Sequence, residues 1–136
     1  MANTLRLEIV TPEAVVYSEE VEMVTLPSEE GELGILPQHV GLMTQMVPGE
    51  MIVRRGGHDE FLAVGDGLVE VTRKRVSILT NMAIAVDKID EARVEEARKR
   101  AEARLREKLS AEEIASVNAS LAHSLAQLHV KRRRRG

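Results

Sequence analysis

Residues 61–79 read FLAVGDGLVEVTRKRVSIL, which is three short apolar runs separated by a glycine-rich turn and by a basic turn. Short apolar runs bounded by turn residues predict β-strands rather than a helix. A fourth such run, Met51–Val53, lies just upstream, on the other side of Gly56-Gly57. Runs this close together predict an antiparallel meander, with Gly65-Asp66-Gly67 as a tight hairpin turn rather than a phosphate-binding loop.

The strand pattern continues toward the N-terminus. Residues 5–10, LRLEIV, alternate apolar and polar positions as a half-buried strand does. Two further apolar runs follow at Val15–Tyr17 and Val21–Leu26, and turn signals lie at residues 28–31 and 48–49. Many short strands joined by regular turns favour a sandwich or a barrel.

After Asn81 the apolar spacing changes to that of helices. The expected helical faces are Val94, Ala97, Ala101 and Leu105 in a first helix, and Ile114, Val117, Leu121, Leu125 and Leu128 in a second. Ser110 and Glu113 form a capping box that opens the second helix, and the short break before it predicts an antiparallel hairpin. The alanine-rich seam of this hairpin buries little apolar area, so we expect it to be weakly held. The sequence therefore predicts a β domain over residues 1–86 and a mobile two-helix domain over residues 87–136.

The composition limits the class of protein. Of the 136 residues 43% are hydrophobic, but there is one Phe, one Tyr and no Trp, so Val, Leu, Ile, Ala and Met must fill the core. The absence of Cys excludes disulfides and thiolate metal sites. No run approaches the roughly 18 apolar residues of a membrane span, and the N-terminus has no signal-peptide core, so we expect a soluble protein. The net charge of −3 hides an asymmetry: residues 1–86 carry 6 basic against 13 acidic residues, and residues 87–136 carry 13 against 9.

The sequence contains no recognisable catalytic or metal-binding motif. The four histidines, His39, His58, His123 and His129, lack the paired spacing of metal ligands. No Walker loop, nucleophile elbow or dinucleotide-binding glycine motif is present, and the carboxylates are scattered. We therefore expect neither an enzyme active site nor a metal site.

The sharpest charge feature is a basic tail made of Lys131, Arg132, Arg133, Arg134 and Arg135. Three interpretations are open: a solvated terminus, a nucleic-acid contact, or docking on an acidic protein surface, toward which clustered charge steers association. The acidic β domain and the scarcity of aromatic residues for base stacking weaken the nucleic-acid interpretation.

Residues 31–42, GELGILPQHVGL, interrupt an apolar run with three glycines and one proline. Such punctuation argues against one long strand and indicates turns or a close approach of the backbone to something else. The segment resembles the signature of the epsilon subunit family of bacterial rotary ATP synthases, called delta in mitochondria. The resemblance spans the chain in one register, through Pro48-Gly49, a Phe61–Val71 hairpin, the helix opening Ile89-Asp90-Glu91-Ala92-Arg93, and Ala126-Gln127-Leu128. Gly41 departs from it, because many relatives carry proline there.

The resemblance implies a β-sandwich of about ten short strands followed by a helical hairpin, in a subunit with no catalytic residues. It implies a place on the rotor stalk, where the subunit couples proton flow to ATP synthesis in the alpha/beta hexamer and restrains ATP hydrolysis. It also implies a peripheral location at the cytoplasmic face of the inner membrane, held there only through the complex. The implied surface for the gamma subunit and the c-ring consists of Glu32, Leu33, Gly34, His39 and Leu42.

In some members of the family the helical hairpin binds ATP. The residues that match this motif here are Ile89, Asp90 and Arg93. Four positions depart from it: Ile84 replaces an acidic residue, Val94 an alanine, and His123 and Gln127 two arginines of the second helix. Without those guanidinium groups a triphosphate loses its main charge-assisted partners, so we expect weak or absent ATP binding and no other cofactor. Asp90 also has a purely structural explanation as a helix N-cap.

In the family, the second helix can extend beside gamma toward an acidic segment of the beta subunits. An apolar stripe that ends in the basic tail suits such a path, since the stripe can pack on gamma while the cations meet carboxylates. The alternative function is a free-standing nucleic-acid-binding module that uses the basic tail.

Overall fold

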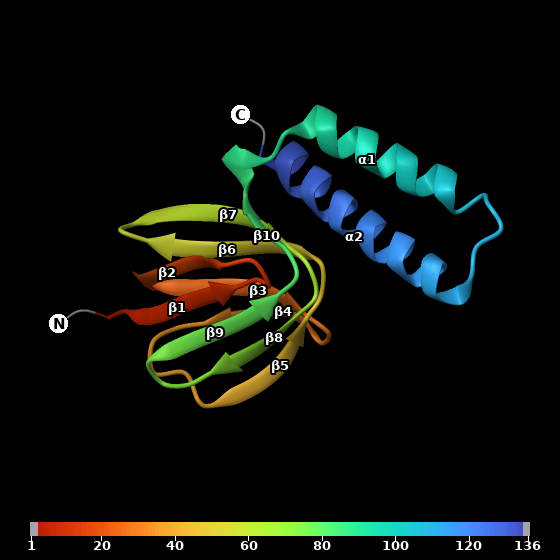
Figure 1. The fold of residues 1–136 in the computed structure, drawn as a ribbon. Helices are drawn as coiled ribbons and strands as arrows, with labels where there is room; N and C mark the ends of the chain where they lie inside the picture. The colour runs from red at the N-terminus through yellow and green to blue at the C-terminus, as the bar shows by residue number, and fades with distance from the viewer. Residues whose placement is uncertain (1–2, 135–136) are drawn as a thin grey trace.

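A continuous sheet of ten strands, followed by two helices, makes up the computed structural model, which describes residues 3–134 (Figure 1). The strands are β1 (Leu5–Val10), β2 (Val15–Val21), β3 (Met23–Ser28), β4 (Gly31–Ile35), β5 (Leu42–Met46), β6 (Gly49–Arg55), β7 (His58–Val64), β8 (Gly67–Val71), β9 (Arg75–Thr80) and β10 (Ala83–Ala85). A short 3-10 turn, η1 (Val86–Lys88), leads to α1 (Glu91–Arg104) and α2 (Ala111–Arg133). The predicted class, a mainly β sandwich of about ten strands followed by a helical hairpin, is confirmed.

The strands are hydrogen-bonded in the order β10-β7-β6-β3-β5-β8-β9-β1-β2, and β4 pairs with β3 outside this path. The sheet curls so that β2, at one end of the order, contacts β6 and β7 near the other end. The Tyr17 hydroxyl on β2 donates to Glu60 Oε1 on β7 at 2.8 Å, and Arg55 on β6 pairs with Glu19 at 3.5 Å and with Glu60 at 3.2 Å. Burial, together with the Glu60 carboxylate, raises the pKa of Tyr17. These polar contacts bring the two ends of the curled sheet together.

The sandwich core is built from Leu, Val, Ile and Met, as the composition predicted. The alternation in β1 is confirmed, since Leu5, Leu7 and Ile9 are all at most 1% exposed. Besides its antiparallel pairing with β2, β1 pairs in parallel with β9, so that the first and the ninth strands lie side by side. That pairing has no local signal in the sequence.

The predicted four-strand meander, and with it the Phe61–Val71 hairpin, is wrong. The strands β6 and β7 pair, and so do β8 and β9, but β7 pairs onward with β10 and β8 pairs with β5. Residues 65–67 therefore carry the chain from one side of the sandwich to the other, and the Gly65 N–H donates to the Met82 carbonyl at 2.9 Å. The reason lies in β7, where Leu62, Ala63 and Val64 are all buried, because this strand faces the core on one side and the helices on the other. A strand covered on both faces takes its partners from tertiary packing rather than from the nearest turn.

The interruption of residues 31–42 by turns is confirmed. The strand β4 ends at Ile35 and β5 begins at Leu42, with a connecting segment in which Gln38 adopts a φ of 70°. Gly31 has a φ of 113°, which only glycine adopts readily, and the Ser28 hydroxyl donates to its carbonyl across the β3–β4 turn. The glycine at the start of the segment thus has an internal structural role.

The two helices form the predicted hairpin (Figure 1). Both predicted caps are present: the Asp90 carboxylate accepts from the Arg93 N–H at 3.2 Å, and Ser110 and Glu113 form the capping box. The Glu113 carboxylate accepts from the Ser110 backbone N–H at 3.0 Å, and this hydrogen bond lowers the pKa of the Glu113 carboxyl group. The local signals therefore placed both helix starts correctly.

The predicted apolar face of α2 is only partly correct. Leu128 is buried, but Ile114 is 41% and Leu125 is 48% exposed, whereas Ala126 and Val130 are buried. The C-terminal half of α2 contacts α1 on one side and β6, β7 and η1 on another, so it buries two faces instead of one. Contact with the sandwich centres on a small cluster of Ala63, Ile89 and Val130. Phe61, Met82, Ile84, Val86 and Val94, all partly buried, pack against this cluster.

Candidate functional site

The outer face of the sheet carries an apolar stripe made of Leu68 on β8, Leu79 on β9, Val10 on β1 and Val15 on β2. These residues are neighbours in the strand register: Leu68 opposes Leu79, Leu79 opposes Val10, and Val10 opposes Val15. Leu68 is 45%, Leu79 56% and Val15 58% exposed. The exposed Leu68, Leu79 and Val15 are thus joined through the half-buried Val10 into one contiguous apolar row across four adjacent strands.

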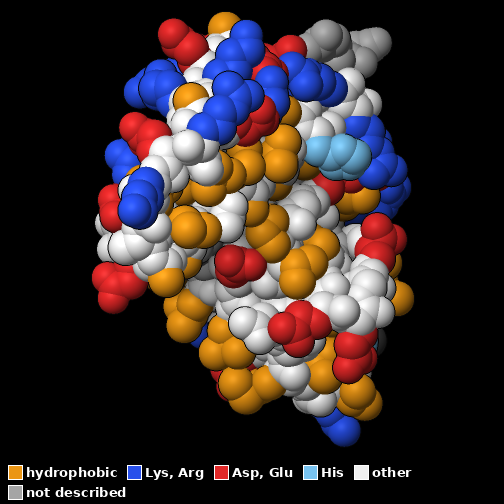
Figure 2. Space-filling view, turned by 90° about the vertical axis from the view of Figure 1, so that its right-hand side faces the viewer, with side chains coloured by type: hydrophobic (Ala, Val, Ile, Leu, Met, Phe, Trp, Pro, Cys, Tyr) orange, Lys and Arg blue, Asp and Glu red, His pale blue; other side chains and the backbone are white. Residues whose placement is uncertain are grey.

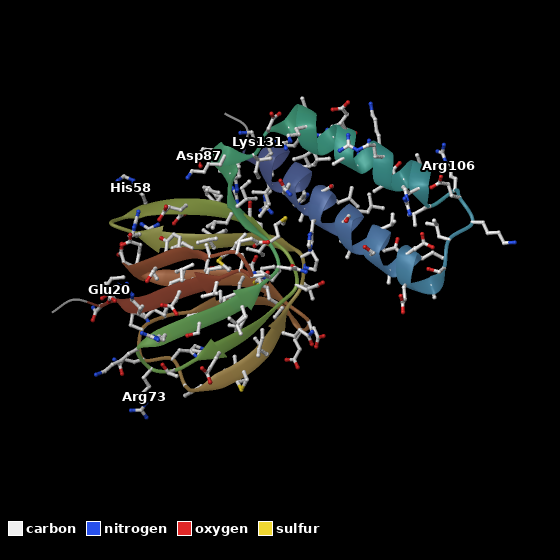
Figure 3. The ribbon with its side chains drawn as sticks, viewed as in Figure 1. Glu20, His58, Arg73, Asp87, Arg106 and Lys131 are labelled. Carbon is white, nitrogen blue, oxygen red and sulfur yellow. The ribbon has the colours of Figure 1, made fainter. Side chains whose placement is uncertain are left out.

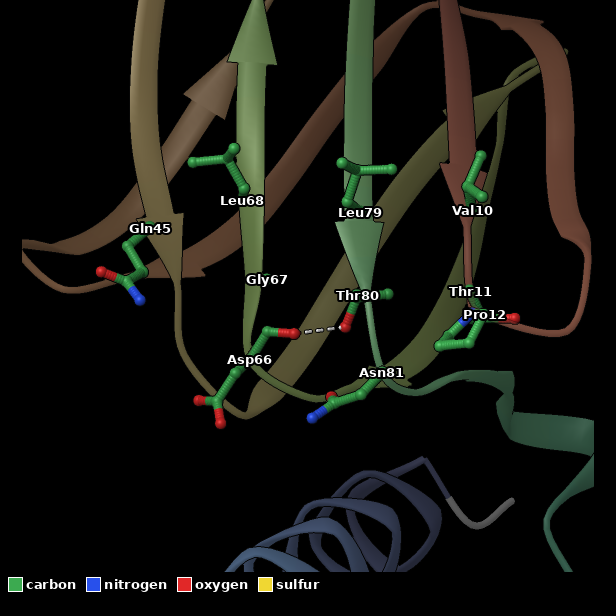
Figure 4. A pocket seen from close by; sticks show the side chains of 10 residues that line it. All are labelled: Val10, Thr11, Pro12, Gln45, Asp66, Gly67, Leu68, Leu79, Thr80 and Asn81. Atoms are coloured by element: carbon green, nitrogen blue, oxygen red, sulfur yellow. Dashed lines mark hydrogen bonds between the residues drawn. The ribbon is translucent and has the colours of Figure 1, made fainter.

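A pocket of about 620 Å³ lies at the end of this stripe (Figure 4). Leu68, Leu79 and Val10 line its strand side, and Asp66, Thr80 and Asn81 lie at the ends of the strands, where the Thr80 hydroxyl donates to the Asp66 carbonyl at 2.6 Å. Seen from the side turned by 90°, charged side chains crowd the upper part of the molecule, where the helices lie, and hydrophobic side chains spread below them (Figure 2). The lining of the pocket itself is apolar where Leu68, Leu79 and Val10 supply it and polar where Asp66, Thr80 and Asn81 supply it.

Of the predicted interface residues, Glu32 and Gly34 are exposed, whereas Leu33, His39 and Leu42 are half-buried. Glu32, Leu33 and Gly34 belong to β4, and Leu33 and Leu42 are half-buried against the core. His39 lies in the connecting segment, where its Nδ1 is 2.8 Å from the Val40 carbonyl oxygen. The exposed apolar residues nearby are Leu36, Val40 and Met43, at 55%, 71% and 61%.

Sequence reasoning missed both Met43 and the apolar stripe. The available signal was the presence of apolar residues at successive positions of one strand, as at Leu68-Val69 and Leu79 after Ile78. Because neighbouring strand residues point to opposite faces, such runs place one apolar side chain in the core and the other outside.

The residues predicted to contact ATP do not all face the same space. Ile89 is 4% exposed and packs in the small cluster below the helices, so its side chain is structural. Asp90 and Arg93 do line a pocket of about 300 Å³ between η1 and the helices, together with Ile84, Lys88, Val94, Ala97, Arg100, Ser124 and Gln127. The Gln127 amide already donates to Met82 Sδ at 3.1 Å. The pocket thus offers three cations and the carboxylate of Asp90, which caps α1.

The basic tail is paired with acidic groups of the same chain, an arrangement that none of the three sequence-based interpretations included. Lys131 Nζ donates to the Val86 carbonyl at 3.1 Å, and Arg132 pairs with Glu91 at 3.5 Å and with Glu95 at 2.6 Å. Arg133 and Arg134 both reach Glu50 on β6. Hydrogen bonds from Arg98 and then from Arg132 lower the pKa of the Glu95 carboxyl group. Arg135 lies outside the described residues.

The histidine on the sandwich side of α2 has an unusual environment. His123 Nε2 is buried and has no hydrogen-bond partner among residues 3–134. A Cβ atom added at Gly65 would lie 2.8 Å from this nitrogen and 2.4 Å from Asn81 Oδ1, so glycine allows α2 to approach the sheet here.

Within the same described residues, no group of three or more His, Asp or Glu side chains is arranged to hold a metal ion. In that part of the chain, neither helix is long and apolar enough to cross a membrane.

Comparison with known proteins matches both parts of the chain. The family model for the beta-sandwich domain of the ATP synthase Delta/Epsilon chain matches residues 4–86, and the model for its long alpha-helix domain matches residues 87–132. The chain is 44% identical over 131 residues to the ATP synthase epsilon chain of Herpetosiphon aurantiacus, with 96% of each chain covered. It is 46% identical over 108 residues to that of Desulforamulus reducens, with 79% of this chain and 82% of the relative covered.

Two solved assemblies contain a chain of similar fold. The first is the mitochondrial ATP synthase of Euglena gracilis, in its OSCP/F1/c-ring part, with a TM-score of 0.76, 23% identity, and coverage of 95% of this chain and 81% of that chain. The second is the central stalk and c-ring of the Tetrahymena thermophila mitochondrial ATP synthase, with a TM-score of 0.56, 13% identity, and coverage of 93% and 96%. At these identities the likeness establishes the fold.

Proposed function

Because the chain belongs to the ATP synthase delta/epsilon chain family, we propose that it is a non-catalytic central-stalk subunit of a proton-translocating ATP synthase. In this role it couples proton flow to ATP synthesis and restrains ATP hydrolysis. Residues 1–86 form the domain that docks on the stalk, and residues 87–136 form the regulatory domain. The subunit sits at the cytoplasmic face of the inner membrane, where the complex holds it. The alternative of a free-standing nucleic-acid-binding module is not supported, since the matches are to ATP synthase chains.

The observation that carries this proposal is the apolar stripe. Leu68, Leu79 and Val15 are about half exposed and in register across adjacent strands, which is costly for a chain that remains alone in water. We assign this face, together with Met43 and the predicted interface residues Glu32, Leu33, Gly34, His39 and Leu42, to contact with the gamma subunit and the c-ring. The stripe supplies apolar area, the connecting segment adds the exposed Leu36 and Val40, and Glu32 on β4 supplies a charge at the edge.

The test of stalk membership is co-purification of the tagged full-length chain with gamma from cells that express the complex. A Leu79→Asp variant places a charge in the middle of the stripe, and we expect it to lose gamma. The matched control is Val16→Asp, which changes an exposed apolar residue that faces η1 and β10, away from the stripe. Retention of gamma by Leu79→Asp would contradict the assigned face, and failure of the unaltered chain to retain gamma would contradict the function itself.

The regulatory role belongs to the hairpin. When α2 extends beside gamma, its basic tail reaches the acidic segment of the beta subunits, where several close cations meet carboxylates. We expect complexes that lack residues 87–136 to hydrolyse ATP faster at low salt, while ATP synthesis is largely retained, because coupling rests on the sandwich. Equal hydrolysis by intact and shortened complexes would remove the regulatory part of the proposal.

A further inference from the structure

Glu50 on β6 is a nearly buried carboxylate whose charged partners all come from the basic tail. Its side chain is 8% exposed. Arg134 Nε donates to Glu50 Oε2 at 2.9 Å and Arg134 Nη2 donates to Oε1 at 2.7 Å, while Arg133 Nη1 lies 3.7 Å from Oε1. Within residues 3–134, these two arginines are its ion-pair partners. Two parallel N–H···O bonds to one carboxylate form the most directional of protein ion pairs.

Phe61 on β7 completes the binding site for Arg134. The guanidinium carbon lies 3.9 Å from the centre of the ring, and this is the only Phe in the chain. A planar guanidinium can stack on a ring and make a bidentate pair in the same pose, whereas an ammonium group can do only one of these well. Glu50 and Phe61 therefore form a guanidinium socket, and the pair with Glu50 raises the pKa of Arg134.

The socket lies at one end of the hairpin, near the point where the chain leaves the sandwich. Lys131 is close to Asp87 and η1, while Arg106 lies at the far tip (Figure 3). Lys131 and Arg132 add contacts to the Val86 carbonyl, Glu91 and Glu95. Among the carboxylates that pair with tail residues 131–134, however, only Glu50 belongs to the sandwich, so its pairs are the ones that a moving hairpin must break.

We propose that the guanidinium socket is a latch that holds the hairpin down on the sandwich and keeps the basic tail away from other acidic surfaces. If the hairpin leaves, Glu50 loses a bidentate charge-assisted pair and Arg134 loses its stacking on Phe61, which disfavours the open state. The latch acts beside an apolar contact, in which Val130 of α2 packs with Ala63 and Ile89 and with partly buried hydrophobic residues around them. The identity of the competing acidic surface rests on the function proposed above, but the latch itself does not.

The full-length chain allows a direct measurement because it has no native Cys. Cysteines introduced at the exposed positions Glu13, on the sandwich, and Lys108, at the hairpin tip, carry a donor and an acceptor dye, and single-molecule energy transfer gives the ratio of open to closed molecules. We expect Glu50→Gln and Arg134→Gln each to raise this ratio about tenfold, since each removes a charge-assisted bidentate pair. Arg134→Lys keeps the charge but loses the fork and the stacking, so we expect a rise of several-fold.

The matched control is Arg106→Gln, which removes one cation from the exposed hairpin tip and should leave the ratio unchanged within twofold. Because Arg134 is in the tail, its substitution leaves the sandwich intact even if Glu50→Gln destabilises β6. An unchanged ratio in Arg134→Gln would overturn the latch, and so would equal effects of Arg134→Gln and Arg106→Gln.

A second measurement separates the latch from the proposed function. In the assembled ATP synthase, Glu50→Gln frees a tail whose cations are all intact, so we expect slower ATP hydrolysis, whereas deletion of residues 131–136 should make hydrolysis faster. If Glu50→Gln opens the hairpin in the isolated chain but hydrolysis does not change, the latch stands and the inhibitory function fails. If the hairpin stays closed, the latch fails whatever the hydrolysis rate.

Discussion

Shortening the two leucines of the apolar stripe to alanine tests the proposed docking face quantitatively. Leu68 is 45% and Leu79 56% exposed in the isolated chain, so about half of each side chain remains to be buried by a partner. Complete burial of a leucine contributes roughly 1.5–3 kcal/mol, and the remaining half therefore contributes about 1 kcal/mol for each residue. Each single alanine variant should bind gamma about 5-fold more weakly, and the double variant about 30-fold more weakly.

The assay is titration calorimetry of the purified chain with the gamma subunit. Val16→Ala is the control, because it shortens an apolar residue that is 44% exposed outside the stripe, beside η1 and β10, and should leave the affinity unchanged. Thermal unfolding of each variant should match that of the unaltered chain within a few degrees, since exposed side chains contribute little to the fold. A double variant that binds gamma within twofold of the unaltered chain would refute the assignment of this face.

Three further predictions concern the pocket, one glycine and one carboxylate. Calorimetry with ATP should show millimolar or weaker binding, because α2 contributes Ser124 and Gln127, and no arginine, to the pocket that Arg93 and Arg100 line; micromolar binding would contradict this. Gly67→Ala should destabilise the sandwich by about 1–3 kcal/mol in urea unfolding, since its Cβ would lie 2.4 Å from the Leu79 carbonyl oxygen, whereas Gly41→Ala, with its nearest atom at 3.7 Å, should be nearly neutral. The pKa of Glu95 is lowered, so the stability that this carboxylate provides to the hairpin is present above its usual pKa of 4.5 and is lost as the pH falls below that value. Thermal melting of the helices at a series of pH values should show this loss in the unaltered chain and not in Glu95→Gln.

Features that depend on neighbours in the sequence were predictable. The alternation of Leu5, Leu7 and Ile9, the N-cap at Asp90 and the capping box at Ser110 each need only a few consecutive residues, and each is present in the structure. Such features follow from side-chain periodicity and from the unpaired N–H groups at a helix start. They fixed the class of fold and the start of both helices.

Features that depend on residues far apart in the sequence were not predictable. The chain crosses at Gly65 instead of turning back, because β10 rather than β8 is the neighbour of β7. The apolar stripe joins residues from β8, β9, β1 and β2, and these residues are neighbours only because β1 pairs in parallel with β9. The pattern of a single sequence does not show which strands lie side by side. The interface residues predicted from one continuous segment therefore did not include the more exposed residues of other strands.

The charge asymmetry between the two parts of the chain could be read from the sequence, but the contact that it produces could not. An excess of acidic residues before residue 87 and of basic residues after it was visible in the sequence, but it indicated only that two different parts were joined. In the structure this asymmetry becomes a specific attraction at one point, since Glu50 of the sandwich binds Arg134 of the tail across 84 residues of chain. Exposed ion pairs of α1 and α2 add little that distinguishes an open hairpin from a closed one, because they travel with it. A competing surface must therefore bind the hairpin more strongly than one bidentate pair and the apolar cluster around Val130 do together, which several clustered carboxylates can achieve and a single exposed carboxylate cannot.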